Sequence, residues 1–85
     1  MEMKIDVPDY TPEAGLRIKW LDGFVISVNQ ETGITVIKAN KNGLVSLAVQ
    51  FLTLAQDNIP PGVHIHFDDS NSLENGSSEL IIERI

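Results

Sequence analysis

The chain has 85 residues and a net charge of −6; 42% of its residues are hydrophobic and 21% are charged. This length and composition predict one folded domain, residues 1–85, and exclude an intrinsically disordered chain. The lack of cysteine excludes a disulfide framework, a thiolate metal site and a cysteine nucleophile. We find no secretory signal pattern and no apolar run long enough to span a bilayer, so we expect a soluble, cytoplasmic protein.

The negative charge is concentrated in the C-terminal half. Through Lys41 the chain has six acidic and five basic residues, whereas from Asn42 onward six acidic residues accompany Arg84 alone. Nucleic acids and anionic membranes bind basic patches, so the pattern argues against both as partners. It favours a basic protein, which an acidic surface attracts over a distance.

The first part of the chain is predicted to form strands. Residues 1–7 alternate between apolar and polar side chains, which predicts a half-buried strand, and residues 8–14 contain two prolines, which predict a loop. Residues 15–21 and 23–29 predict a hairpin around Gly23, for which two registers compete. A two-residue turn mixes charged and apolar residues on one face. We prefer a three-residue loop, because it collects the apolar pairs on one face: Trp20 with Phe24, Ile18 with Ile26 and Leu16 with Val28.

A further strand is predicted at residues 34–39, after a four-residue loop at 30–33. This loop length places Thr35, Ile37 and Ala39 on the same face as the apolar residues of the preceding strand. Trp20 is expected in the core, opposite Phe24.

Residues 41–57 carry the strongest helix signal in the sequence. Asn40 can cap its start, and Asn58 with the Pro-Pro-Gly run at 60–62 marks its end. The apolar arc spans roughly 220°, about twice the stripe that a surface helix needs to bury. Either loops of the same chain cover the extra width, or it serves self-association or a partner. The face expected to be buried comprises Leu44, Leu47, Ala48, Phe51, Leu52 and Ala55.

The C-terminal part is predicted to be a second hairpin. Residues 63–68 and 78–85 read as strands, joined by residues 69–77, which are rich in turn formers. The whole order predicts an α+β two-layer fold, with a mostly antiparallel sheet of five or six strands and one helix on one face.

Two histidines and a carboxylate alternate along the strand at 63–68. On a strand His64, His66 and Asp68 project to one face, where Glu79 or Glu83 could complete a two-histidine, one-carboxylate metal site. The alternative is that they form the exposed face of an amphipathic strand and bind no metal. No phosphate-binding loop, nucleophile elbow or metalloprotease motif is present, so the sequence does not indicate an enzyme.

The second half of the chain resembles a known family. The similarity is carried by residues 39–44, 46–48 and 52–56, then by Gly62-Val63-His64-Ile65-His66 with Asp68, and by residues 72–73 and 77–82. These stretches are similar to a small α+β family of bacterial immunity proteins from polymorphic toxin systems, immunity protein 32. The resemblance implies a protein that binds a cognate toxin and blocks it, without catalysis and without a cofactor.

The charge imbalance indicates where such a toxin would bind. The expected binding face is acidic and suits a basic toxin domain. Two other functions stay open from the sequence: a metal-binding domain or small metal-dependent enzyme at the histidine row, and a structural module that forms a homodimer through the helix. The expected toxin-binding residues are His64, His66, Asp68, Asp69, Glu74, Glu79 and Glu83.

Overall fold

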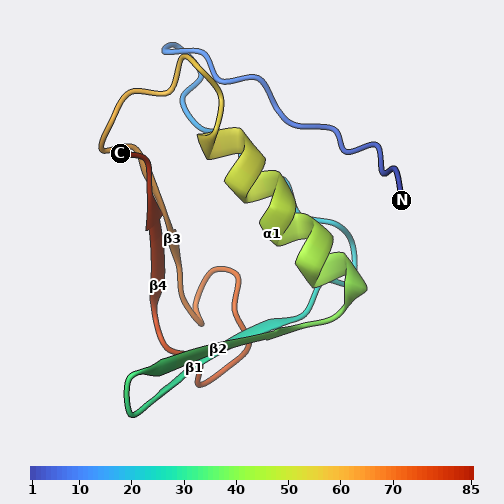
Figure 1. Ribbon diagram of the computed structural model, residues 1–85, viewed down its shortest axis with the longest axis vertical. Coiled ribbons are helices and arrows are strands. Elements are labelled where there is room, and N and C mark those ends of the chain that lie inside the picture. Colours follow the sequence, from blue (N-terminus) through green and yellow to red (C-terminus); the bar gives the residue numbers. More distant parts are fainter.

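A computed structural model describes residues 1–85 and has two β-hairpins and one helix (Figure 1). The first hairpin comprises β1, Ile26–Glu31, and β2, Ile34–Ala39. Helix α1, Lys41–Leu54, follows directly, and the second hairpin comprises β3, His64–Phe67, and β4, Leu80–Glu83. The predicted α+β class is confirmed. No helix of the structure has the length and apolar character needed to cross a membrane.

The prediction of one sheet with five or six strands is wrong, because the strands form two separate antiparallel pairs. A short irregular segment links the pairs along the free edge of β1. There the Glu74 amide donates to the Ile26 carbonyl over 2.8 Å, and the Ser78 amide donates to the Val28 carbonyl over 2.7 Å. The Val28 amide donates to the hydroxyl of Ser77 rather than to a backbone carbonyl, so no regular ladder forms.

The β1–β2 hairpin has a tighter turn than the sequence predicts. Glu31 pairs with Ile34, and the two turn residues, Thr32 and Gly33, have φ of 40° and 80°. A two-residue turn with positive φ at both central positions has a twist that matches the twist of the flanking strands. The strand register therefore differs by two residues from the register that a four-residue loop would give. Ile37 and Ala39 still keep the predicted face, opposite Val28 and Ile26.

The strands predicted at residues 1–7 and 15–21 are absent. The backbone of the second segment bonds to side chains of α1: the Leu21 amide donates to Ser46 Oγ over 2.9 Å, and Gln50 Nε2 donates to the Lys19 carbonyl over 2.7 Å. Backbone amides and carbonyls that already bond to helix side chains are not available for hydrogen bonds to another strand. The segment runs alongside α1 instead of pairing with β1.

Trp20 and Phe24 meet as the sequence predicts, although no strand pairing brings them together. Their rings stack with centroids 4.7 Å apart, and Trp20 also meets Phe67 edge to face at 5.9 Å. Gly23, between them, has φ of 74°, the left-handed conformation expected for the loop.

Helix α1 begins where predicted and ends three residues early. Asn40 Oδ1 accepts from the Gly43 amide over 2.8 Å, which confirms the cap. At the other end Arg84 Nη1 donates to the carbonyls of Leu54 and Gln56 over 2.8 and 2.9 Å. These carbonyls are satisfied without another helical turn, so the chain departs before Asp57.

The face of α1 predicted to be buried is largely exposed. Leu44, Phe51 and Leu52 are 57%, 46% and 44% exposed, whereas Ser46, Gln50 and Thr53 are fully buried. The polar side chains are inside because they bond to backbone: Ser46 and Gln50 to the N-terminal segment, and Thr53 Oγ1 to the Val49 carbonyl. The core joins the inner side of α1 to both hairpins and comprises Ile26, Val28, Leu47, Leu54, Ile65, Phe67 and Leu73.

Candidate functional site

The outer face of the β3–β4 hairpin carries the histidine row. Ile65 and Phe67 point into the core, so the alternating residues His64 and His66 face solvent. On β4 Glu83 lies opposite His64, and Ile81 lies opposite His66. The face therefore holds both predicted histidines, but with different neighbours.

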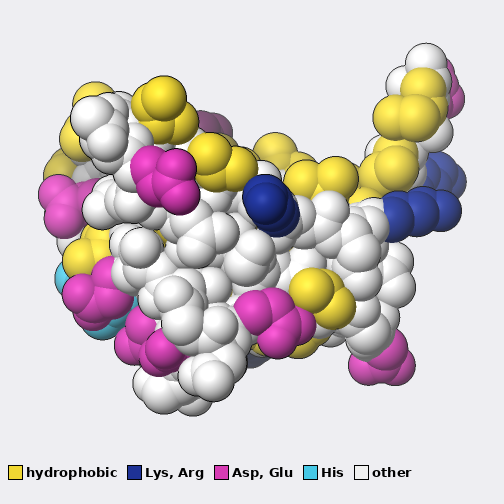
Figure 2. Space-filling model, turned by 90° about the horizontal axis from the view of Figure 1, so that it is seen from below, with side chains coloured by type: hydrophobic (Ala, Val, Ile, Leu, Met, Phe, Trp, Pro, Cys, Tyr) yellow, Lys and Arg dark blue, Asp and Glu magenta, His cyan; other side chains and the backbone are white.

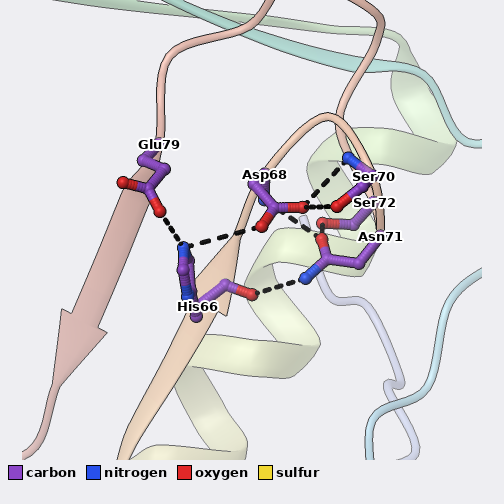
Figure 3. A network of polar contacts seen from close by, with 6 residues as sticks. All are labelled: His66, Asp68, Ser70, Asn71, Ser72 and Glu79. Atoms are coloured by element: carbon purple, nitrogen blue, oxygen red, sulfur yellow. Dashed lines mark hydrogen bonds and ion pairs between the residues drawn. The ribbon is translucent and has the colours of Figure 1, made fainter.

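His66 lies between two carboxylates (Figure 3). Its Nε2 is 2.6 Å from Glu79 Oε1 and 3.7 Å from Asp68 Oδ2. These two distances place His66 within hydrogen-bond reach of Glu79 and ion-pair reach of Asp68. We call His66, Asp68 and Glu79 the acidic cluster.

Residues after β3 hold Asp68 in place. The Ser70 hydroxyl and amide both donate to Asp68 Oδ1, over 2.8 and 3.0 Å. Asn71 Oδ1 accepts from the Asp68 amide, and Asn71 Nδ2 donates to the His66 carbonyl. Buried Leu73 anchors the end of this loop in the core. The carboxylate is therefore oriented before any partner arrives, which lowers the entropic cost of binding.

The same contacts favour the charged form of Asp68. The hydroxyl of Ser70 is the main cause that holds the pKa of this carboxyl below its usual range, followed by the Ser70 amide, with His66 contributing further. Asp68 thus stays negative across the ordinary pH range.

The other predicted residues lie outside the acidic cluster. His64 Nδ1 is 3.1 Å from the Gly62 carbonyl oxygen, so the two histidines do not converge on one point. Asp69 Oδ2 accepts from the Gly76 amide over 3.3 Å, and Glu74 and Glu83 are exposed. Asp69 and Glu74 belong to the loop between β3 and β4, whereas Glu83 is at the far end of β4.

No lysine or arginine neutralises these carboxylates. The ion pairs of the structure are the two made by His66 and one between Lys19 and Asp6, at 4.0 Å. Arg84, the one basic residue after Lys41, has its guanidinium bound to α1 carbonyls. Figure 2 shows acidic side chains gathered beside a histidine at one end of the visible face, with lysine or arginine side chains elsewhere on it.

The acidic cluster offers one imidazole and two carboxylates to a cation. One ligand atom from each of the three residues lies within 4.8 Å of the others. This set differs from the predicted two-histidine row, since His64 is replaced by Glu79. The arrangement has the groups for charge recognition, and no activated nucleophile is paired with a base.

Three residues that shape this region were not singled out from the sequence. Ser70 and Asn71 follow Asp68 at the spacing of a side-chain-bonded turn, a signal that the sequence does contain. Arg84 gives no sequence signal for its role, because its partners are 30 and 28 residues away.

Comparison with known proteins places the chain. Residues 34–85 match the family model described as Immunity protein 32. The chain belongs to the immunity protein 32 family. No curated protein and no solved structure matches it. The matched range runs from the start of β2 through α1 and the β3–β4 hairpin, so it includes the acidic cluster and confirms the resemblance seen in the sequence.

Proposed function

We propose that this immunity protein binds a cognate toxin domain and neutralises it by protein–protein contact, without catalysis. Membership of the immunity protein 32 family supports the toxin as partner. The protein would act in the cytoplasm of the cell that makes the toxin, where the toxin's target is at risk.

The observation that carries the proposed binding face is the set of carboxylates with no lysine or arginine partner. Asp68 is pre-oriented by Ser70 and Asn71, and Glu79 flanks the same imidazole. Asp69, Glu74 and Glu83 extend the negative surface along the hairpin and its loop, with His64 beside them. A basic toxin would approach such a surface under electrostatic attraction and meet charges that need little rearrangement.

The test is calorimetric binding to the toxin-like protein encoded beside this gene, at low and at physiological salt. We expect tight binding that weakens as salt rises, because the carboxylates are exposed and screened by ions. The triple variant Asp68→Lys, Asp69→Lys, Glu74→Lys should weaken binding at least about tenfold and flatten its salt dependence. A matched control, Glu2→Lys, Asp9→Lys, Glu13→Lys, changes net charge equally in the N-terminal segment and should have a much smaller effect.

Different results would change different parts of the proposal. Unchanged affinity and salt dependence in the first triple variant would move the toxin to another face and keep the immunity role. Absence of binding to the neighbouring gene product would remove that product as the cognate toxin.

A second candidate function is metal binding at the acidic cluster, favoured by the convergence of three ligand atoms. Calorimetric titration with zinc near neutral pH tests it, with His66→Ala as the control. Uptake that disappears in the variant would support a metal site; no uptake would remove this candidate.

A further inference from the structure

The chain contains two Asn-Gly pairs, Asn42-Gly43 and Asn75-Gly76. In such a pair the backbone nitrogen of the glycine can attack the side-chain carboxamide of the asparagine. Glycine favours this attack, because it has no Cβ to obstruct the close approach of its own backbone. The attack also requires the peptide between the two residues to rotate until the nitrogen faces Cγ. The local structure therefore decides whether a given pair reacts.

Asn75-Gly76 lies in an exposed turn of the loop between β3 and β4. The Ser77 amide donates to the Glu74 carbonyl over 3.1 Å, and Gly76 has φ of 85°. This bond, with positive φ at the third residue, is typical of a type II turn. Both central residues are exposed, and a Cβ built on Gly76 would meet no atom within 4 Å. The peptide between them thus has open space in which to rotate.

Few bonds hold this turn closed. Besides the bond from Ser77 to Glu74, the Gly76 amide donates to Asp69 Oδ2 over 3.3 Å, a long contact to an exposed carboxylate. The Asn75 carboxamide has no hydrogen-bond partner. Exposed loops with so few bonds open locally at a small fraction of the free energy of global unfolding.

The loop on both sides of the turn is fixed independently of it. The Glu74 amide donates to the Ile26 carbonyl over 2.8 Å, and the Ser78 amide donates to the Val28 carbonyl over 2.7 Å. Both acceptors belong to β1. The turn can therefore rearrange while the loop stays attached to the rest of the fold.

Asn42-Gly43 is held in a conformation that prevents the attack. Gly43 is buried in the first turn of α1, and its amide donates to Asn40 Oδ1 over 2.8 Å. The Asn42 carboxamide donates to the Asp22 carbonyl over 2.8 Å. Rotation of this peptide would break the helix cap and the contact with Asp22, so it requires the start of α1 to unfold.

We propose that Asn75 is a site of spontaneous deamidation and that the fold protects Asn42 from the same reaction. The Gly76 nitrogen loses its proton and forms a bond to Cγ of Asn75. The bond from Cγ to Nδ2 breaks, so ammonia leaves with that proton and a five-membered cyclic imide remains. Water then opens the imide, and no oxidant or reductant is needed. Opening at Cγ gives aspartate, whereas opening at the backbone carbonyl gives isoaspartate, in which the main chain runs through Cγ.

Either product adds a carboxylate to the loop, next to Glu74 and close to Asp69. The net charge of −6 becomes more negative by one unit. The consequence for binding rests on the proposed function: a basic toxin domain attracted to these carboxylates would meet one more negative charge. The deamidation itself depends only on the chain and water.

The test follows the full folded chain during incubation at mildly alkaline pH. Each deamidation raises the mass by about 1 Da and adds a negative charge that anion exchange detects. Cleavage after glutamate places Asn75 in the fragment 75–79 and Asn42 in the fragment 32–74, so the two sites are measured separately. We expect Asn75 to react at least about tenfold faster than Asn42.

Two controls show whether the chemistry and the fold act as proposed. Asn75→Gln keeps the carboxamide but would need a six-membered ring, so the fragment 75–79 should gain no mass in the same period. This exposed side chain has no bonds to lose, so the variant should fold normally. In guanidinium chloride the fold is removed, and Asn42 and Asn75 should then react at rates within about threefold of each other.

Three results would overturn the proposal. One is an equal or faster reaction at Asn42 in the folded protein. The second is an intact Asn75 in the folded protein over a period in which the unfolded chain reacts at both sites. The third is a mass gain of the fragment 75–79 that persists in Asn75→Gln. Because no toxin takes part in these measurements, failure of the proposed function would leave this test intact.

Discussion

Gln50 of α1 donates a hydrogen bond to the carbonyl oxygen of Lys19 over 2.7 Å, and its side chain is fully buried. Together with Ser46, which accepts from the Leu21 amide, it fastens an extended segment that no strand pairs. Polar residues of this helix are therefore buried against the rest of the fold, where the apolar pattern predicts Leu44 and Leu52.

Replacing Gln50 should cost more stability than replacing the exposed Leu52. We expect Gln50→Ala to lower the free energy of unfolding by about 2 kcal/mol, because the Lys19 carbonyl loses its donor and a buried volume is emptied. The matched change Leu52→Ala should cost less than about 1 kcal/mol. Urea unfolding at low protein concentration measures both, and we expect a single transition. The reverse ranking would contradict the observed orientation of α1.

Gly43 should not tolerate even a methyl group. A Cβ at this position would lie 2.5 Å from the Val25 carbonyl oxygen and 3.1 Å from Ala39 Cβ. Gly43→Ala should therefore destabilise the fold by about 1–3 kcal/mol, although alanine alone favours a helix by about 1 kcal/mol. Thermal unfolding compares it with Leu44→Ala, a neighbouring exposed position where little change is expected. A stabilised Gly43→Ala would show that α1 and β1 are further apart.

Asn40 makes three hydrogen bonds, and two substitutions at this position distinguish the contribution of its acceptor oxygen from that of its donor nitrogen. Its Oδ1 accepts from the Gly43 and Val25 amides, and its Nδ2 donates to the Gly23 carbonyl. Asn40→Ala should cost about 2 kcal/mol or more, since the helix cap and both loop contacts are lost. Asn40→Asp keeps the acceptor oxygen and loses only the donor, so its loss in chemical denaturation should be clearly smaller. Equal losses would mean that the cap contributes little.

Asp68 should titrate below its ordinary value of 3.8. A pKa lowered by folding contributes stability that is present above the unfolded value and is lost as the pH falls through the folded pKa. We expect Ser70→Ala to raise the pKa of Asp68. Carboxyl NMR shifts recorded from pH 6 down to about 2 measure this pKa. Ser72→Ala is the control, because the Ser72 hydroxyl donates to Asn71 and does not touch Asp68. The same pKa in the wild type and in Ser70→Ala would assign the shift to another group.

The fold was predictable from the sequence where local signals decide it. The Asn40 cap, the left-handed Gly23, and the existence of both hairpin turns follow from short-range chemistry. The orientation of α1 was not predictable from periodicity, since Ser46 and Gln50 are buried by bonds to residues more than 20 positions away. Alternation likewise suggested strands in the N-terminal part, because an extended segment has the same pattern whether it pairs with a strand or with helix side chains.

The candidate site was predictable in its chemistry and only partly in its geometry. The alternation of His64, His66 and Asp68 correctly places both histidines on the outer face of β3. Which carboxylate meets His66 depends on the irregular path of the chain before β4, and the path favours Glu79 over Glu83. A long loop of turn residues does not reveal such a path in advance.

The end of α1 is synthesised before the residue that binds its carbonyls, because Arg84 comes 30 residues after Leu54. Until the ribosome has added Arg84, the Leu54 carbonyl at the end of α1 has no guanidinium to donate a hydrogen bond to it. At ordinary elongation rates of about 5–20 residues per second, the emerging helix spends a few seconds with that terminus hydrated and its inner side uncovered by β3 and β4. These carbonyls can therefore gain their donor only after β4 and Arg84 have been synthesised, and a translation product that ends before Arg84 would lack this contact.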